Sequence, residues 1–355
     1  MSDAPTALAI GTGSSVTQGI LKALAIAELP TRIVAACVTP YSAGLYTAER
    51  AYICPYAEDP AFLDWLTEVC QAEGVRAVLS GVEPVLATLS PAAEQLAERT
   101  GAVCVVSPPD TFEIGHDKLA TCRWLADAGL PHPRFAAGDD EGAVAALAAE
   151  CGYPLVAKPR RGRTARGVVI VPDGAALERL VGREDVLVQE HLDDAGGEYT
   201  VGCLCDREGR LRGSVAMRRE LRLGTTVRAE VGAYPEIRAL SERVVERLAP
   251  VGPCNVQLRL REGRPVPFEL NVRFSGTTPM RARLGFNEVE EAVRHLALGE
   301  PARGMADARH GTVVRYFNEL YLPAQAVAEL QSTGRLDHAD AAGTLVEDWG
   351  RLGPH

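Results

Sequence analysis

Two neighbouring runs of alternating residues, between Gly252 and Arg273, constrain the fold of this chain most strongly. The second run, VPFELNVRF, places Glu269, Asn271 and Arg273 at every second position, with Phe268 among the apolar residues between them. The first run, GPCNVQLRL, alternates in the same way, and the connection EGR joins the two. Alternation with period two predicts half-buried strands, and a short Gly-containing connection predicts an antiparallel hairpin.

The register of this hairpin determines which polar side chains meet. If the turn centres on Gly263, Gln257 faces Glu269 and Asn255 faces Asn271. Side chains directly opposite each other have Cβ atoms roughly 4.5–5.5 Å apart, so their oxygen atoms would converge. One carboxylate with amide oxygens suits Mg²⁺, which prefers oxygen ligands. The solvated polar face of an ordinary hairpin remains the alternative.

Composition excludes several classes of protein. The 355 residues are enough for two or three domains, and a hydrophobic content of 46% supplies a sizeable core. The formal net charge of −10 argues against a protein that binds nucleic acid through bulk electrostatics. The chain has no apolar run near the ~20 residues of a membrane span and no hydrophobic signal core. We therefore expect a soluble, cytoplasmic protein with no membrane partner.

The cysteines and histidines do not form a metal motif. Nine cysteines are scattered without C-x-x-C spacing, and seven histidines are equally dispersed. We expect Cys203 and Cys205, in the apolar run VGCLC, to be small buried thiols rather than zinc ligands.

Residues 1–110 alternate short apolar strands with helices. The strands are TALAI, TRIVAACV, AVLSG and AVCVV, and the helices lie near 16–27, 62–73 and 91–99. This alternation predicts a parallel sheet with helices on its faces. Beyond it we expect helices at 116–129 and 141–152, followed mainly by antiparallel strands. The expected fold class is therefore α/β in the N-terminal part and α+β in the lobes that follow.

The loop GTGSSVTQG after the first strand invites comparison with a dinucleotide-binding loop. Its third fingerprint position holds Val16 instead of Gly, and no acidic residue stands where one would bind a ribose. This departure argues against an NAD-dependent dehydrogenase, which we keep as an alternative. The loop is then either a plain strand-to-helix turn or a segment that faces substrate.

Two lysines precede the hairpin. Lys118 lies in the first turn of a helix, and Lys158 ends an apolar strand just before the basic loop RRGRTARG. A lone lysine in either place is usually a solvated charge. In series with a basic loop and a carboxylate–amide face, the two lysines predict phosphate ligands.

The chain resembles the ATP-grasp superfamily, especially the branch like the carbamoyl phosphate synthetase large chain and the related amino-acid ligases. The matching segments are GHDKLATCRWL, YPLVAKPRRGRTARGV, VLVQEHLDDAGGEYTV, GPCNVQLRL and VPFELNVRFSGTTPMRARLGFNE. The resemblance implies an N-terminal α/β domain at 1–110, a central lobe with a phosphate lid at 111–185, a C-terminal lobe with the metal site at 186–310, and an extension at 311–355.

The resemblance also implies an ATP site with Mg²⁺, or with Mn²⁺ in its place. Lys118 and Lys158 would hold the phosphates, and the loop 160–167 would close over them. Lys158 and Arg273 would act in catalysis, with Arg273 steadying the transferred phosphate. The remaining implied residues are the adenine hinge Gln189, Glu190 and Leu192, the ribose-binding Glu198, and the metal ligands Gln257, Glu269 and Asn271.

The lid departs from the family pattern, which is usually rich in Gly and Ser. It carries Arg161, Arg163 and Arg166. These arginines could bind phosphates or an acidic substrate, because guanidinium groups suit both.

Two further segments are candidates for substrate binding. The run SGTT offers Ser275, Gly276 and Thr277 at the start of a helix, where backbone N–H groups favour a carboxylate. The run MRRELRLGTTVRAEV offers Arg218, Arg219, Arg222 and Arg228 on the substrate side, of which Arg218 and Arg222 are the selected candidates. An exposed, charged strand pair is the alternative interpretation of this second run.

The resemblance implies an ATP-dependent carboxylate–amine ligase that joins amino acids through an acyl phosphate and releases ADP and phosphate. The product would be a dipeptide or a γ-glutamyl-type amide. Its partners would be small-molecule substrates, with no nucleic acid, and a homodimer is the expected assembly. A non-catalytic nucleotide-binding regulatory protein of the same fold is the alternative class. We do not expect carbamoyl phosphate synthesis itself, because the sequence shows no amidotransferase and no second ATP-grasp copy.

Overall fold

The computed structural model describes residues 4–162, 167–337 and 345–346. The chain divides into two units, of which the first contains residues 1–106, 274–306 and 314–355 and the second contains residues 107–273 and 307–313. This division groups residues 274–306 with the N-terminal sheet. The four domains expected from the sequence remain a prediction.

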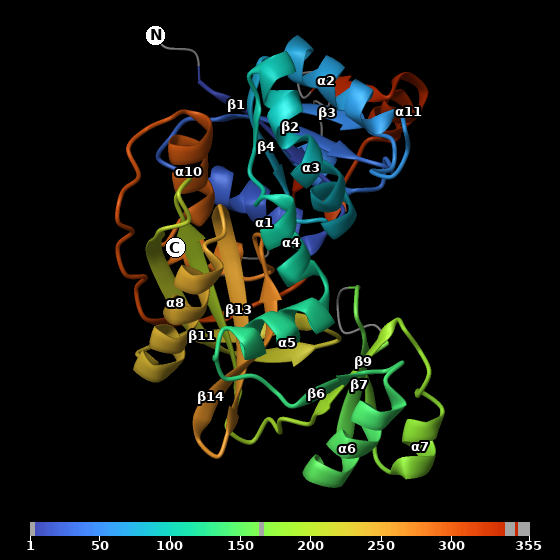
Figure 1. Cartoon of the computed structure of the whole chain (residues 1–355). Helices are drawn as coiled ribbons and strands as arrows, with labels where there is room; N and C mark the ends of the chain where they lie inside the picture. Colours follow the sequence, from blue (N-terminus) through green and yellow to red (C-terminus); the bar gives the residue numbers. More distant parts are fainter. Residues whose placement is uncertain (1–3, 163–166, 338–344, 347–355) are drawn as a thin grey trace. The chain divides into compact units, whose positions relative to one another are not determined.

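A six-stranded sheet in the order β17-β3-β2-β1-β4-β5 forms the centre of the first unit (Figure 1). Neighbours among β1 to β5 are parallel, as predicted, and β17 pairs antiparallel with β3. The strands are β1 Thr6–Ile10, β2 Arg32–Cys37, β3 Arg50–Ile53, β4 Val75–Ser80, β5 Val103–Cys104 and β17 Arg335–Asp337. The helices are α1 Ser15–Leu24, α2 Phe62–Glu73, α3 Glu83–Thr100, α9 Thr278–Arg283, α10 Glu288–Ala292 and α11 Ala324–Thr333.

Helix α3 begins at Glu83, ahead of the start predicted at Pro91. Pro84 lies in the first turn of this helix, where its missing N–H costs nothing, and Glu83 favours the positive end of the helix. Pro91 lies inside the helix on its exposed side. The apolar pattern alone could not show that the helix continues through a proline.

Two valine side chains, Val16 and Val82, pack tightly against glycines around the loop after β1. A Cβ on Gly81, which follows β4, would lie 2.3 Å from a methyl carbon of Val16. A Cβ on Gly11 would lie 2.4 Å from a methyl carbon of Val82. Val16 and Val82 therefore fill the space where β1 and β4 diverge, which is where a dinucleotide approaches the backbone in this type of sheet.

The buried carboxylate of Glu73, at the end of helix α2, connects this helix to strands β2 and β3. Glu73 accepts hydrogen bonds from Arg32 at 2.6 Å and Arg50 at 2.8 Å, and from the hydroxyl of Tyr52. Arg50 also pairs with Asp337 of β17. Burial raises the pKa of Glu73, but the hydrogen bonds from Tyr52, Arg50 and Arg32 outweigh burial and lower the pKa to about 2.

The second unit contains two sheets. The larger has the order β14-β13-β10-β11-β12-β15, and the smaller has the order β6-β9-β7-β8. The strands are β6 Phe135–Ala137, β7 Leu155–Pro159, β8 Val169–Val171, β9 Val186–Glu190, β10 Glu198–Cys205, β11 Leu211–Arg222, β12 Thr225–Val231, β13 Gly252–Arg261, β14 Arg264–Asn271 and β15 Gly311–Val314. The helices are α4 Pro109–His116, α5 Lys118–Asp127, α6 Glu141–Cys151, α7 Gly174–Glu178 and α8 Pro235–Leu248.

Helices cover one face of each of these sheets (Figure 1). Apolar residues of α8, such as Val244, pack on Val201 and Val256 of the larger sheet. Helices α6 and α7 pack on the smaller sheet through Leu147 and Leu177. The face of the larger sheet away from α8 therefore remains for polar side chains.

The helix predicted over residues 116–129 is α5, which begins two residues later, at Lys118, and a helix that the sequence did not predict, α4, ends just before it at His116. Asp117 has extended backbone angles, and its side chain accepts hydrogen bonds from the N–H groups of Leu119 and Ala120. An aspartate in this role caps the start of a new helix. The break places Lys118 at the first position of α5, in the first turn as predicted.

All nine cysteines are free thiols, and Cys203 and Cys205 are buried as expected. Among the described helices, none combines the length and hydropathy that crossing a membrane requires.

Candidate functional site

The hairpin formed by β13 and β14 has the predicted register at the polar positions. Gln257 pairs with Glu269, and Asn255 pairs with Asn271. The turn, however, is shorter than predicted, because Arg261 pairs with Arg264 and only two residues connect the strands. Both connecting residues have positive φ, 52° and 77°, which is typical of a tight hairpin turn.

A β-bulge reconciles the short turn with the predicted register. Leu258 pairs with Pro267 while Gln257 pairs with Glu269, so Phe268 is the extra residue. The carbonyl oxygen of Phe268 accepts a hydrogen bond from Lys158 Nζ at 3.4 Å. The Phe268 ring lies 5.6 Å from this ammonium and 5.8 Å from the Arg259 guanidinium. The prediction that Phe268 faces the apolar side is therefore wrong, since the bulge turns its ring to two cations.

Glu269 is at the centre of the polar face. Asn271 donates to its Oε1 at 3.0 Å, and Gln257 donates to the same oxygen at 3.4 Å. Burial raises the pKa of Glu269, but the charges of Lys118 and Lys158 and the hydrogen bond from Asn271 outweigh burial and lower the pKa below its usual range. The carboxylate is therefore ionised and surrounded by cations and amides.

The three predicted metal ligands are brought together, although their amide oxygens are not all turned to one point. Gln257 Oε1 accepts a hydrogen bond from Arg219 Nη2 at 2.6 Å. Among the described residues, no group of three or more His, Cys, Asp or Glu side chains could hold a metal ion. The donor set of one carboxylate and two amides fits Mg²⁺, which takes few protein ligands and keeps waters or phosphate oxygens. Rotation of the amides would present their oxygens to such an ion.

The two predicted phosphate lysines approach the same carboxylate from different elements. Lys158 ends β7 and is buried, with 6% of its surface exposed. Burial lowers the pKa of Lys158, and the charge of Glu269 opposes this shift. Lys118 donates from Nζ to the carbonyl of Gly162 at 2.9 Å. Both ammonium groups therefore hydrogen-bond to carbonyl oxygens.

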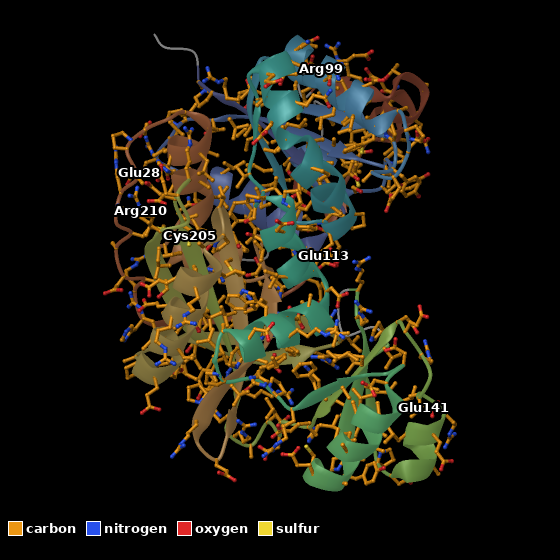
Figure 2. All side chains as sticks on the ribbon, in the orientation of Figure 1. Glu28, Arg99, Glu113, Glu141, Cys205 and Arg210 are labelled. Atoms are coloured by element: carbon orange, nitrogen blue, oxygen red, sulfur yellow. The ribbon has the colours of Figure 1, made fainter. Side chains whose placement is uncertain are left out.

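Arg160 and Arg161, at the start of the predicted lid, form ion pairs with residues of α4 and of the N-cap of α5. Arg160 donates to Asp117, with a closest distance of 2.5 Å. Arg161 pairs with Glu113, which Figure 2 labels on α4. The predicted lid residues Arg163 and Arg166 lie outside the described residues. The arginines at 160 and 161 therefore have carboxylate partners within the protein.

The predicted adenine hinge spans the end of β9 and the residues after it, and its side chains make internal contacts. Gln189 is buried and donates to Cys122 Sγ at 2.7 Å. Glu190 accepts from Arg261 at 3.0 Å and from the backbone N–H of residue 134 at 3.0 Å. The carbonyl of Leu192 accepts from Arg259 at 2.8 Å. Contact with a base at this hinge would therefore use backbone groups rather than these side chains.

Glu198, the predicted ribose-binding acid, lies between two arginines. Arg219 donates to its Oε1 from Nε at 3.0 Å and from Nη2 at 2.6 Å. Arg259 donates to its Oε2 from Nε at 3.1 Å and from Nη2 at 2.9 Å. The polar face thus contains Arg219, which the sequence offered only as one of four arginines on the substrate side, and Arg259, to which the sequence assigned no role.

The arginine chosen from the pair Arg218–Arg219 lies on the other side of the sheet. Arg218 pairs with Tyr199, whose ring packs with the α8 side of the sheet, whereas Arg219 pairs with Glu198 on the polar face. Arg222 is exposed near the end of β11. The alternation of β10 and β11 could have identified Arg219, but only if their pairing were known.

The SGTT segment belongs to the first unit and is fastened internally. Arg281 donates to the hydroxyl oxygens of Ser275 at 3.2 Å and Thr277 at 2.6 Å. Arg281 and its partner Glu288 are buried, with an N–O distance of 2.5 Å. The carbonyl of Gly276 accepts from Arg315. The hydroxyls thus contact Arg281. The backbone N–H groups of Ser275 and Thr277, which the sequence offered to a carboxylate, donate to the hydroxyls of Thr278 and Ser275.

Arg273 follows β14 in the second unit. Its backbone N–H donates to the carbonyl of Asn271 at 2.8 Å, and its side chain is partly buried. The chain therefore places Arg273 two residues beyond the last predicted metal ligand, just after the strand that carries Glu269.

Two family models match the chain. Residues 182–320 match the model described as "ATP-grasp in the biosynthetic pathway with Ter operon". Residues 7–104 match the model described as "PylC-like, N-terminal domain".

Curated relatives are carbamoyl phosphate synthase large chains. That of Streptomyces avermitilis is 27% identical over 270 residues, which cover 71% of this chain and 24% of the relative. That of Streptomyces griseus is 26% identical over 319 residues, which cover 85% of this chain and 26% of the relative. The chain thus spans about a quarter of the length of the curated relatives it matches.

Solved structures show the same fold at lower identity. N5-carboxyaminoimidazole ribonucleotide synthetase from Thermus thermophilus has a TM-score of 0.67 at 20% identity, covering 91% of this chain and 86% of that one. The biotin carboxylase domain of the Hydrogenobacter thermophilus 2-oxoglutarate carboxylase has a TM-score of 0.66 at 18% identity, covering 86% and 73%. The chain therefore carries an ATP-grasp domain behind an N-terminal domain of the PylC-like type, which confirms the resemblance found in the sequence.

Proposed function

We propose that the protein is an ATP-dependent carboxylate–amine ligase that joins two amino acids, or an amino acid and a similar amine, and releases ADP and phosphate. The observation that carries this proposal is the polar face of the larger sheet with its two lysines. On this face, amide side chains flank the carboxylate of Glu269, and the cationic side chains outnumber the carboxylates. ATP-grasp enzymes use ATP and Mg²⁺, and the Hydrogenobacter domain was crystallised with MgADP and bicarbonate.

The charge of this face complements a magnesium-bound nucleotide. Four cations and two carboxylates leave a formal charge of +2, and MgATP carries about −2. These groups are Lys118, Lys158, Arg219, Arg259, Glu198 and Glu269. A neutral or acidic face would not favour a triphosphate in this way.

The order of the groups along the polar face indicates how a nucleotide would be oriented on it. The hinge that ends in Leu192 precedes Glu198, and Arg259 bonds to both. Glu269 and Asn271 lie on β14, with Arg273 two residues further on. A nucleotide with its base at the hinge and its ribose at Glu198 would direct its phosphates toward Glu269.

In this proposal the residues of the chain act by positioning and by neutralising charge. Mg²⁺, when bound through Glu269 and the two amides, would neutralise the transferred phosphoryl group. Lys158 and Lys118 would bind phosphate oxygens in place of the carbonyls they now contact. Arg273 would steady the acyl phosphate that forms from the substrate carboxylate. An amine then displaces phosphate from this acyl phosphate, so no protein nucleophile is needed.

The test is a mass-spectrometric screen of amino-acid pairs with ATP and Mg²⁺, combined with phosphate release. We expect an amide product together with ADP and phosphate. AMP and pyrophosphate would refute the mechanism. A phosphorylated or carbamoylated product, for example with bicarbonate as the acid, would reject the amino-acid ligase and retain the ATP site. A protein that binds MgATP without turnover in any mixture would point to the regulatory class.

A further inference from the structure

Arg219 bridges two groups that the proposed function needs to be free. Its Nη2 lies 2.6 Å from Glu198 Oε1 and 2.6 Å from Gln257 Oε1. Its side chain is 11% exposed, so these bonds are shielded from water. The guanidinium therefore holds the oxygen that a metal ion would take and an oxygen that a ribose would take.

The acceptor capacity of Glu198 is already filled. A carboxylate offers about four lone-pair positions. Arg219 supplies two N–H groups to Oε1, and Arg259 supplies two to Oε2. Ribose hydroxyls can therefore donate to Glu198 only after one arginine withdraws.

The contacts of the two arginines indicate which one withdraws. Arg259 also donates to the carbonyl of Leu192 at 2.8 Å and lies over the Phe268 ring. Arg219 has its other hydrogen bond to Gln257. Movement of Arg259 would disturb the hinge, whereas movement of Arg219 would free Glu198 and Gln257 together.

We propose that Arg219 is a phosphate-binding residue of the ATP site, and that its guanidinium passes from Glu198 and Gln257 to a phosphate oxygen when the nucleotide binds. This inference rests on the proposed function. A nucleotide with its ribose at Glu198 and its metal at Gln257 has its phosphates between these two residues, where Arg219 lies. The paired N–H groups of the guanidinium match the geometry of a phosphate. A hydrogen bond from Arg219 to the phosphate would therefore replace the one that Arg219 loses to Glu198.

The same movement couples metal binding to nucleotide binding. While Arg219 holds Gln257 Oε1, a divalent cation lacks one ligand and meets a positive charge. After the movement, Gln257 can turn its oxygen to the metal. Nucleotide and metal therefore each increase the affinity for the other, and one guanidinium carries part of that coupling.

The test compares Arg219→Met, Arg219→Lys and the control Arg243→Met with the unchanged protein. Arg243 is exposed on α8, so its variant removes the same charge away from the polar face. Calorimetry measures the affinity for MgADP, and electron paramagnetic resonance of free Mn²⁺ measures metal binding without nucleotide. For Arg219→Met we expect MgADP to bind about tenfold more weakly, or about 1.4 kcal/mol, and Mn²⁺ alone to bind more tightly. Arg219→Lys should lose less affinity for MgADP, and Arg243→Met should change neither quantity.

The outcomes separate this inference from the proposed function. Equal MgADP affinity in the unchanged protein and Arg219→Met would overturn the role of Arg219 and leave the ATP site standing. Failure of the unchanged protein to bind MgADP would overturn both. If circular dichroism shows that Arg219→Met does not fold, Arg219→Lys decides. Unchanged affinities for MgADP and for Mn²⁺ in that folded variant would overturn the inference.

Discussion

Replacement of Glu73 by Gln should destabilise the first unit in a pH-dependent way. The substitution keeps the size of the side chain and removes the charge that Arg32 and Arg50 contact. The pKa of Glu73 falls from an ordinary value of 4.5 to about 2. At about 1.4 kcal/mol for each pKa unit, ionisation of Glu73 stabilises the folded state by roughly 3 kcal/mol near neutral pH.

The sign of the pH dependence follows from the lowered pKa. A carboxyl group with a folded-state pKa below its unfolded value stabilises the fold above the unfolded pKa. That contribution is lost as the pH falls from about 4.5 to about 2. The difference in unfolding free energy between the unchanged protein and Glu73→Gln should therefore be about 3 kcal/mol at pH 7 and shrink toward pH 2.

Hydrogen exchange at increasing denaturant, followed in peptides that cover Arg50–Ile53, isolates this unit from the rest of the chain. Glu68→Gln is the matched control, because Glu68 is exposed on the same helix. A difference below about 1 kcal/mol at pH 7, or one that stays constant down to pH 2, would refute the reasoning.

Three further outcomes are expected. Glu269→Gln and Asn271→Ala should each reduce phosphate release by about 100-fold or more with an unchanged circular dichroism spectrum, and near-normal turnover in both would mean an ordinary polar face. Arg281→Met should lower the unfolding free energy by about 3–5 kcal/mol, because it leaves Glu288 buried without its cation, and a small change in chemical denaturation would contradict this. Burial lowers the pKa of Lys158 below its ordinary value of 10.5. As the pH rises through this lowered pKa, Lys158 should lose its charge and the protein should lose affinity for ADP. Lys158→Arg should keep its affinity for ADP over the same pH range, because arginine stays charged.

The residue pairs of the polar face could be predicted because one face of each strand is apolar and the other is polar. Gln257 opposite Glu269 follows from alternation and an assumed turn centre. The assumed centre was half a residue away from the real one, and the bulge at Phe268 corrected the difference. The sequence carries no obvious signal for a bulge at Phe268, although Pro267 beside it cannot donate to the ladder.

The choice between Arg218 and Arg219 could not be made from the sequence. Consecutive arginines lie on opposite faces of a strand, and either can be the inward one. The pairing with β10 decides, and that pairing includes an irregularity between Leu204 and Cys205. Long-range pairing of this kind is not encoded in a local pattern.

The break before α5 was within reach of the sequence. The helix predicted from the sequence begins at His116, and α4 was not predicted, although the aspartate just before Lys118 is a capping signal. Oδ1 of Asp117 accepts the capping hydrogen bonds, and Oδ2 accepts hydrogen bonds from Arg160 at the start of the lid. That second contact joins segments far apart in sequence, so a local pattern could not reveal it.

Phe268 is an extra residue between two regular stretches of the ladder, one from Arg261–Arg264 to Leu258–Pro267 and the other from Gln257–Glu269 to Asn255–Asn271. Deletion of Phe268 alone would therefore leave Glu269 opposite Gln257, in a ladder without a bulge. Such a hairpin would lack the carbonyl and the ring that Lys158 contacts. Loss of the bulge residue in a related chain should therefore keep the pairing of the polar face and remove both contacts to Lys158.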